Sequence, residues 1–476
     1  MKIKVENRPA GKAICDVLLV GAFENGKGDF DDLLKHEHFE GKKDEALIIN
    51  TQGKYPSRRI CFLGLGKESD VNLDKIRNAV ANGVRKAAEV KAGSVSVSID
   101  VDGLASFDIA QASAEGLILG SYKFCGYHKK KEEKKNIHLA TILVSNNLKL
   151  KDAIKGAKWG QTCSESENLA RDLVNAPSNL VTPEYMANYA KKMAKSVGLK
   201  CEILDPKKEG MECLWAVAKG SKNPPKVIVL KHNASAKKEL IALIGKGITF
   251  DSGGISIKPS SKMWEMRGDM AGAAAVIEAM RAIACLDIKK NIIAVIPLAE
   301  NMPDGAALKP GDVVGSLDGT TVEIISTDAE GRMILADAIT YAKDLGATKM
   351  FDCATLTGGC ITALGDIASG LLGNNQELID EILEASEKTG EKMWHLPLFE
   401  EYKDYLKSNV ADLKNCMDRG MASASTGATF LHRFVGDTPW VHVDIAGTAF
   451  LSKNRGIYSE GATGVPLRTI LEWLRD

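Results

Sequence analysis

The chain has 476 residues, of which 45% are hydrophobic, and its 62 lysines and arginines balance its 62 aspartates and glutamates. This length exceeds that of one ordinary domain, so we expect two domains with sizeable cores. A formal net charge of zero excludes a chain-wide attraction to nucleic acid or to anionic membranes, although it does not exclude a local basic patch.

The N-terminal segment "MKIKVENRPAGKAICDVLLVGAF" begins basic and turns apolar, as a signal peptide does. Asp16 interrupts the apolar part, however, so we interpret "AICDVLLVGAF" as the first strand. The ten cysteines include no CxxC pair, a pattern typical of reduced, intracellular proteins. No segment has the length of a membrane helix. We therefore expect a cytoplasmic protein.

The first part of the chain alternates strand and helix patterns. The strand-like runs occupy residues 13–20, 45–50, 58–66, 95–101 and 138–145. Helical patterns occupy residues 73–90 and 107–122. This alternation predicts an α/β domain with a largely parallel sheet. We place a macro-like N-terminal α/β domain at residues 1–155, with the domain connection inside a long helical stretch.

The charge run "KKKEEKK" at residues 129–135 lies between two of these elements. Because its charges are mixed in sign, we interpret it as a solvated loop. A contact to nucleic acid is the alternative interpretation. It would need many cationic contacts to the phosphate backbone.

The second part opens with a helix whose N-cap is predicted to be Thr182 and whose first turn holds Pro183. Strand-like, nearly continuously apolar runs follow at residues 226–232, 240–250, 291–300, 321–327 and 348–357. Such runs are typical of strands that are covered on both faces. Helical patterns separate some of them, at residues 270–286 and 330–346. We therefore predict an α/β protein of two domains, each with a mostly parallel sheet flanked by helices.

Charged residues follow the ends of several of these strands, where ligands of open α/β sheets bind. Lys246 and Asp251 lie at the end of the run 240–250, and Asp269 lies at a helix start. Asp328 and Glu330 follow the run 321–327. If these strands are neighbours, four carboxylates converge.

Four converging carboxylates would repel one another and would also lose hydration. Divalent cations would relieve both costs. Oxygen-rich ligand sets suit Mg, Mn or carboxylate-bound Zn, and shared carboxylates suit a pair of ions that activates a water.

Each of these residues also has a simpler interpretation when it is taken alone. Asp269 would be a helix N-cap. Lys246 would be a lysine at the edge of the core whose amine reaches water. Arg332 would be a salt-bridge partner. The segments "GKG" and "SGG" are too short to indicate phosphate binding.

Several segments, taken together, resemble the leucyl aminopeptidase (cytosol aminopeptidase) family, peptidase family M17. They are "GKGITFDSGGISIKP", "STDAEGR", "ARDLVNAPSNLVTPEYMA", "IPLAENMPDGAALKPGDVV", "FDCATLTGG" and "WVHVDIAGTAF". The resemblance extends from about residue 160 to residue 476 and is weaker in the first domain. It implies a catalytic dimetal aminopeptidase domain at residues 156–476, in a cytoplasmic homohexamer that removes N-terminal, preferably leucine-like residues from peptides.

The resemblance also implies roles for individual residues. The implied metal ligands are Lys246, Asp251, Asp269, Asp328 and Glu330, holding two divalent ions, Mn or Zn. The implied catalytic residues are Lys258 and Arg332, of which Arg332 would hold a bicarbonate that shuttles a proton. The implied substrate pocket is lined by Met266, Thr355, Gly358 and Ala446. The family usually has Asn where this chain has Ser326, and the sequence alone does not explain this difference.

The residue types fit this chemistry. A lysine amine binds a metal ion only when it is neutral, and burial beside two dications would depress the pKa of Lys246. A protonated Lys258 would stabilise the oxyanion that forms at the scissile carbonyl. A planar guanidinium such as that of Arg332 suits a planar anion.

Two further functions compete with this prediction. Some members of the family also bind DNA, but a neutral chain argues against this role, because affinity for the phosphate backbone needs many cationic contacts. A metal-dependent phosphoester hydrolase would need a basic phosphate-binding cluster, which is missing from the sequence. A dipeptidase with a Cys-Gly preference stays open.

Overall fold

The computed structural model describes residues 1–24, 30–35, 37–127, 137–145, 147–233, 239–418 and 420–475. The chain forms two compact units, one of Met1–Asn168 with Lys453–Glu460, and one of Leu169–Ser452 with Gly461–Asp476. The charge run at 129–135 lies outside the described residues, so its interpretation as a loop stays a prediction. In the described part of the chain, no helix combines the length and the apolar character needed to cross a membrane.

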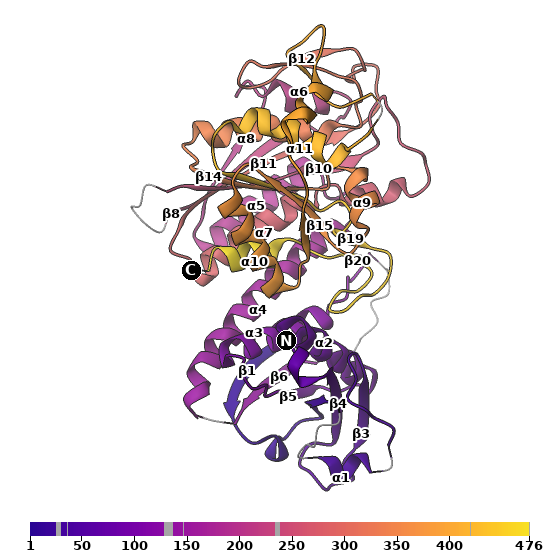
Figure 1. The fold of residues 1–476 in the computed structure, drawn as a ribbon, viewed down its shortest axis with the longest axis vertical. Coiled ribbons are helices and arrows are strands. Elements are labelled where there is room, and N and C mark those ends of the chain that lie inside the picture. Colours follow the sequence, from indigo (N-terminus) through magenta and orange to yellow (C-terminus); the bar gives the residue numbers. More distant parts are fainter. Residues whose placement is uncertain are drawn as a thin grey trace. The chain divides into compact units, whose positions relative to one another are not determined.

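The first unit is built on a six-stranded sheet with the order β1-β6-β5-β2-β4-β3 (Figure 1). Its strands are β1 (Lys2–Asn7), β2 (Val17–Phe23), β3 (Ala46–Asn50), β4 (Arg59–Gly66), β5 (Ser94–Ser98) and β6 (Leu139–Val144). All neighbouring pairs are parallel except β3 and β4. Its helices are α1 (Asp31–Leu34), α2 (Leu73–Glu89), α3 (Ser106–Gly120) and the first part of α4 (Asn147–Asn175).

The prediction that the first strand begins in "AICDVLLVGAF" was wrong, because β1 precedes it and pairs with β6. β1 alternates lysine and apolar residues: Ile3 and Val5 pack against the core of this unit, while Lys2 and Lys4 are exposed. This alternation is typical of an edge strand with one solvated face. The same lysines gave the N-terminus the basic character that we compared with a signal peptide.

Lys453–Glu460 belongs to the first unit although it comes from the end of the chain. Ile457 is buried against Ala81 and Leu119. Arg85 donates from Nη1 to the carbonyl oxygen of Gly456 at 2.6 Å. This short segment therefore completes the surface of α2 and α3, which the sequence analysis did not predict.

The second unit is built on a nine-stranded sheet with the order β16-β15-β18-β14-β9-β11-β8-β7, and β10 also pairs with β11. Its strands are β7 (Lys200–Leu204), β8 (Lys226–Asn233), β9 (Ile241–Gly245), β10 (Gly247–Asp251), β11 (Asn291–Asn301), β14 (Lys349–Ala354), β15 (Ser369–Gly373), β16 (Met393–His395) and β18 (Trp440–Asp444). The central strands β18, β14, β9 and β11 are parallel, whereas β8, β7 and β15 run against their neighbours. The carboxyl ends of the central strands therefore meet at one edge.

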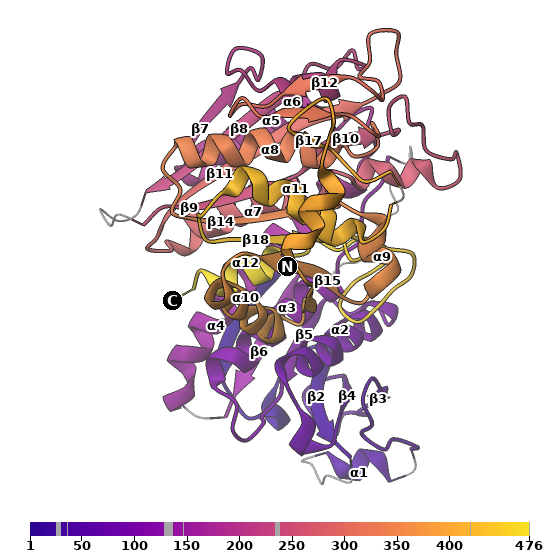
Figure 2. The same ribbon diagram turned by 45° about the horizontal axis from the view of Figure 1, so that its top comes forward.

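Helices cover both faces of this sheet (Figures 1 and 2). On one face lie α5 (Pro183–Val197), α7 (Ala271–Leu286), α10 (Gln376–Thr389) and α12 (Leu467–Trp473). On the other face lie α6 (Glu212–Ala218), α8 (Glu330–Asp344) and α11 (Ser423–Val435). A short helix, α9 (Gly358–Leu364), follows β14. Thr182 is the N-cap of α5 as predicted, since its side chain accepts a hydrogen bond from the Tyr185 N–H.

One predicted core strand lies elsewhere. Of the run 321–327, only β13 (Thr321–Glu323) is a strand, and it belongs to a three-stranded sheet with β12 (Val313–Gly315) and β17 (Leu413–Lys414). The apolar Ile324 is fully buried, which explains why the run looks like a core strand. Asp328 in the turn before α8 and Glu330 at the start of α8 therefore reach the edge of the main sheet without a neighbouring strand.

Candidate metal centre

Lys246 lies at the carboxyl edge of the main sheet, between β9 and β10. Its N–H donates to the carbonyl oxygen of Cys353 at 3.1 Å, and its carbonyl oxygen accepts from Ala273 at 2.9 Å. A Cβ at Gly245 would lie 2.4 Å from the carbonyl oxygen of Gly272, so the glycine lets α7 approach the strand closely. The backbone of Lys246 is thus fixed on both sides.

The amine of Lys246 is buried among oxygen atoms. It lies 2.8 Å from Oδ1 of Asp269, 2.9 Å from Oε1 of Glu330 and 2.8 Å from the carbonyl oxygen of Thr355. Only 2% of Lys246 is exposed, so the alternative of a lysine that reaches water is wrong. Burial by itself lowers the pKa of Lys246, but the charges of Asp269 and Glu330 outweigh it and raise the pKa above its ordinary value.

Asp269 ends the short helix Met263–Gly268 and precedes α7. The alternative of an N-cap is wrong, because α7 has Met270 at its N-cap and no side-chain cap. The carboxylate of Asp269 instead accepts from Lys246 and, at 2.6 Å, from the hydroxyl of Thr355. Its second oxygen, Oδ2, is buried and has no hydrogen-bond partner among the residues that the structure describes.

A second group of charges lies beside the first. Lys258 places its amine 2.7 Å from Oδ2 of Asp251 and 2.5 Å from Oδ1 of Asp328. One carboxylate oxygen from each of Asp251, Asp328 and Glu330 lies within 4.8 Å of the others. Glu330 therefore belongs to both groups, because it also contacts Lys246. The structure thus brings together all five candidate metal ligands and Lys258.

The pKa values of these carboxylates show that they are crowded. Burial and then the charge of Asp251 raise the pKa of Glu330 to about 8. Burial raises the pKa of Asp269 to about 6, and burial and the charge of Asp251 also raise the pKa of Asp328. Like charges in a buried site disfavour full ionisation. Cations are therefore needed to keep all of these groups ionised at neutral pH.

Two buried oxygen atoms test whether divalent cations fit this site. Oδ2 of Asp269 and Oε2 of Glu330 have no hydrogen-bond partner among the described residues. An unpartnered buried carboxylate oxygen is unfavourable by about 1–3 kcal/mol or more. Coordination of a hard cation would satisfy both atoms. The donor set, carboxylates with one amine, therefore fits divalent metal ions.

Asn301, at the end of β11, is a site residue that the sequence analysis missed. Its Nδ2 donates to Oδ1 of Asp251 at 2.8 Å and to the carbonyl oxygen of Thr327 at 3.0 Å. Thr327 in turn donates from Oγ1 to the carbonyl oxygen of Gly253 at 2.6 Å. Asn301 therefore ties the loop after β10 to the segment that carries Asp328. The strand-end rule could have found it, because it follows the predicted strand "NIIAVIPLAE".

The structure explains Ser326. Its Oγ accepts a hydrogen bond from the Asp328 N–H at 3.2 Å. Asn side chains form the same local turn, so Ser can stand in for Asn at this position. Asn415 holds the segment from the other side: its Oδ1 accepts from the Ile325 N–H at 2.8 Å, and its Nδ2 donates to the carbonyl oxygen of Ser326 at 2.7 Å.

Arg332 lies in the first turn of α8 and is 5% exposed. Its Nη1 donates to the carbonyl oxygen of Asn415 at 2.9 Å, whereas its buried Nε has no partner within the described part of the chain. Burial lowers the pKa of Arg332 below its ordinary value. Among the ion pairs of the described residues Arg332 has no carboxylate partner, so its alternative role as a salt-bridge residue has no support. A guanidinium with free donors can hold a small anion.

The residues of the predicted substrate pocket lie on segments next to this cluster. Thr355 contacts both Lys246 and Asp269. Gly358 is exposed, and a Cβ added there would meet nothing within 4 Å, so the space in front of it is open. Ala446 and Met266 are half-buried, and the carbonyl oxygen of Met266 accepts from the Asp269 N–H at 3.3 Å.

Asp444, which is fully buried at the end of β18, was not among the predicted site residues. Its carboxylate accepts from the N–H groups of Leu356 at 3.2 Å and Ala446 at 3.1 Å, and from the Thr357 hydroxyl at 2.6 Å. Asp444 therefore joins the two loops that carry Thr355, Gly358 and Ala446.

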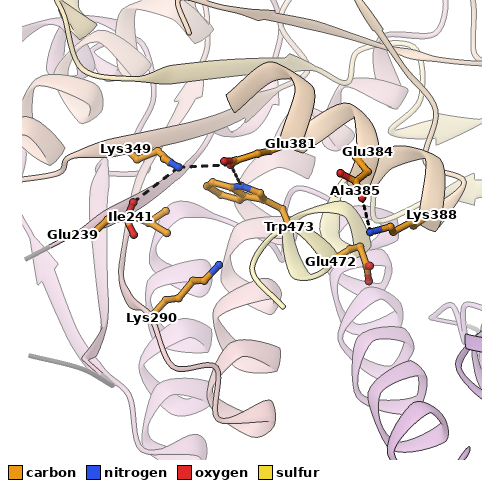
Figure 3. Close-up of a pocket in the computed structure, with 10 residues that line it drawn as sticks. All are labelled: Glu239, Ile241, Lys290, Lys349, Glu381, Glu384, Ala385, Lys388, Glu472 and Trp473. Carbon is orange, nitrogen blue, oxygen red and sulfur yellow. Dashed lines mark hydrogen bonds and ion pairs between the residues drawn. The ribbon is translucent and has the colours of Figure 1, made fainter. Parts of the chain in front are cut away.

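A separate cavity of about 280 Å³ lies where β9 and β14 begin, at the opposite edge of the sheet (Figure 3). In Figure 3, Lys349 points between Glu239 and Glu381, at 3.9 and 3.6 Å. Lys388 lies 2.8 Å from Glu384. No predicted site residue lines this cavity, and three of its carboxylates, Glu239, Glu381 and Glu384, pair with its lysines, so we assign the chemistry to the carboxyl edge.

Comparisons with known proteins show the family to which the chain is similar. The family model "Cytosol aminopeptidase family, catalytic domain" matches residues 168–471, and "Cytosol aminopeptidase family, N-terminal domain" matches residues 23–131. Probable cytosol aminopeptidases of Alkaliphilus oremlandii (strain OhILAs) and Solibacter usitatus (strain Ellin6076) are each 42% identical, with 100% of this chain and 99% of the relative covered.

Solved structures are similar over the whole chain as well. The bottromycin maturation enzyme BotP in complex with Mn has a TM-score of 0.89 and 32% identity, covering 97% of this chain and 99% of that one. A variant of the tomato leucine aminopeptidase has a TM-score of 0.89 and 31% identity, covering 100% of this chain and 97% of that one.

Proposed function

This chain belongs to the cytosol aminopeptidase family, and from that premise we propose that its carboxylate and lysine cluster binds two divalent cations and removes leucine-like N-terminal residues from peptides. As a member of this family, the protein is a metal-dependent aminopeptidase. The observation that carries the assignment to this cluster is the pair of buried, unpartnered oxygens on Asp269 and Glu330.

The two groups of side chains suggest how the cations are divided. Lys246, Asp269 and Glu330 would hold one ion together with Asp251. Asp251, Asp328 and Glu330 would hold the other. The support is geometric: Lys246 contacts Asp269 and Glu330, while Asp251, Asp328 and Glu330 gather within 4.8 Å. Mn and Zn both suit such ligands, and the relative BotP was solved with Mn.

When bound, such ions lower the pKa of a coordinated water and polarise the peptide carbonyl. The residues of the chain contribute the rest. Asp251 and Asp328 aim the Lys258 ammonium into the cluster, and their charges, against the effect of burial, raise its pKa. A protonated Lys258 at this place can donate to the oxygen that becomes negative in the transition state.

Arg332 would hold a bicarbonate that moves the proton to the leaving amine. Its unpartnered Nε supports this role, because a guanidinium in a buried site needs an acceptor. The first turn of α8 adds N–H groups that favour an anion nearby. The carboxylates that could otherwise act as a base are committed to the cations.

Met266, Thr355, Gly358 and Ala446 would receive the side chain of the N-terminal residue. The open space in front of Gly358 leaves room for a leucine-like group. A methionine side chain adapts to varied shapes, which supports a broad preference. We further propose a cytoplasmic homohexamer. Its support is the resemblance to the family and the naming of relatives as cytosol aminopeptidases.

Metal analysis of the purified protein tests the assignment. After dialysis against Mn²⁺ or Zn²⁺ we expect two ions per chain, and hydrolysis of leucine p-nitroanilide that depends on them. Glu330→Ala removes a ligand shared by both ions and should abolish turnover. Unchanged turnover in this variant would exclude the cluster as the active site. Light scattering tests the hexamer separately.

A further inference from the structure

Gly331 occupies a position where no side chain fits beside Lys246. It is the second residue of α8 and is buried. A Cβ at this position would lie 2.5 Å from Cε, 2.7 Å from Nζ and 2.9 Å from Cδ of Lys246. The end of the lysine side chain therefore passes through the space that any other residue would fill.

Lys246 cannot yield at its backbone. Its N–H and carbonyl oxygen are hydrogen-bonded to Cys353 and Ala273, and a Cβ at Gly272 would meet the carbonyl oxygen of Cys353 at 2.2 Å. The side chain is free to yield only at its end, where the amine contacts Asp269 and Glu330. A larger residue at 331 would thus displace the amine and leave the strand in place.

The backbone of Gly331 itself tolerates a side chain. Its φ lies outside the left-handed region in which glycine is required. Alanine is also the best helix former, so a Gly331→Ala substitution favours α8. The presence of glycine at position 331 is therefore explained by the space that the Lys246 side chain occupies, not by the conformation of the helix.

We propose that Gly331 is a positioning residue. Because it has no side chain, the Lys246 amine can lie where it binds the cation next to Asp269. This inference rests on the proposed function, in which Lys246 and Asp269 hold one of two ions. It follows that a methyl group at position 331 selectively weakens the binding of that ion. The other ion, at Asp251, Asp328 and Glu330, does not use the Lys246 amine as a ligand, so it should stay bound.

Equilibrium dialysis against a series of Mn²⁺ concentrations, with metal counted per chain, tests this. At a concentration that saturates two sites in the wild type, Gly331→Ala should retain one ion. The ion next to Asp269 should bind about 10–100-fold more weakly, which is the usual effect of disturbing a group that orients a ligand. Gly305→Ala is the matched control, because a Cβ there meets nothing within 4 Å and should leave both ions bound. Thermal unfolding verifies that each variant is folded.

A double-mutant cycle shows whether Gly331 acts through the lysine. In a Lys246→Ala background, adding Gly331→Ala should cause no further loss of Mn²⁺ affinity, because the side chain that the new methyl group meets is gone. The double variant also decides the matter if Gly331→Ala alone unfolds, since it should then recover the fold.

Two results would overturn the inference alone: full binding of both ions by Gly331→Ala, or an equal loss of affinity with and without Lys246. A wild-type chain that binds fewer than two ions would overturn the proposed function and this inference with it.

Discussion

The carboxylate of Asp251 lies between an amide and an ammonium group, Asn301 on one oxygen and Lys258 on the other. The acidic candidates could be predicted from the sequence because charged residues after apolar runs stand out. Asn301 could have been found in the same way, because it follows an apolar run, but Asn415 and Asp444 could not, since their roles depend on partners far away in the chain. Asn415 reaches Ser326 across 89 residues, and Asp444 reaches Leu356 across 88.

Replacing Arg332 by lysine should lower kcat for leucine p-nitroanilide while changing KM little. A lysine keeps the charge but loses the planar fork that holds an anion and also contacts Asn415. Groups that move protons in a transition state contribute on the order of 10²–10⁴-fold, so a loss of about 10²-fold is expected. Steady-state kinetics measure it. Arg433→Lys, at an exposed arginine near Asp318, is the control, and a kcat equal to the wild type in Arg332→Lys would exclude the proton-transfer role.

Replacing Asp444 should affect substrate binding. Asp444→Ala leaves the N–H groups of Leu356 and Ala446 without their acceptor, at about 1–3 kcal/mol each, and separates the loops of the pocket. We expect KM to rise at least several-fold. Asp444→Asn keeps one carbonyl oxygen for these groups and should be milder. Equal KM values for both variants and the wild type would show that the loops hold their positions without Asp444.

At the scale of elements, the central strands were predictable because they are continuously apolar. β9 and β14 lie within predicted runs, and β8 and β11 extend one residue beyond theirs. The exceptions have physical reasons. β1 alternates lysine with apolar residues, as exposed edge strands do. β13 is three residues long, and the burial of Ile324 next to it extends the apolar pattern beyond the strand. Register and sheet membership depend on distant partners, which periodicity does not show.

The contact between α6 and α8 should make stability depend on pH. Asp337 in α8 is fully buried and accepts from the N–H groups of Leu214 and Leu317, both at 2.9 Å. Burial raises the pKa of Asp337 to about 7, well above the unfolded value of 3.8. Between these values the native chain binds more protons than the unfolded chain, so the free energy of unfolding falls as pH rises.

Denaturant unfolding of the wild type and Asp337→Asn at pH 5 and pH 8 measures this effect. From pH 5 to pH 8 the wild type should lose stability relative to the variant, by a few kcal/mol at most, since one pKa unit corresponds to about 1.36 kcal/mol. Asp318→Asn is the control. The pKa of Asp318 is lowered, despite its partial burial, by hydrogen bonds from Ser316 and Thr320, so this group stays ionised throughout the range. If the free energies of unfolding of the wild type and Asp337→Asn changed with pH in parallel, Asp337 would not be the group that causes the pH dependence.

At the scale of the whole molecule, the chain passes between its two units three times, after Asn168, after Ser452 and after Glu460. The short return segment packs Ile457 against Ala81 and Leu119 of the first unit. Residues near the end of the chain are therefore needed to complete the core of the part that is synthesised first.

Ile457→Ala should consequently destabilise the first unit. Truncation of a buried isoleucine costs about 2–5 kcal/mol, because apolar contacts are lost and a cavity is left. Hydrogen exchange of amides in α2 and α3 should accelerate, whereas amides in the strands around Lys246 should change little. Ile361→Ala, at a half-exposed position, is the control. Unchanged protection of α2 and α3 would show that the return segment does not support this unit.

Asn415 and Asp444 hold segments at the carboxyl edge of the sheet through hydrogen bonds. Both residues come late in the chain, so they are synthesised after every candidate metal ligand. A nascent polypeptide that still lacks them carries all the acidic groups but not the supports of the Ser326 segment or of the two pocket loops. The cleavage machinery is therefore assembled only when translation is nearly finished.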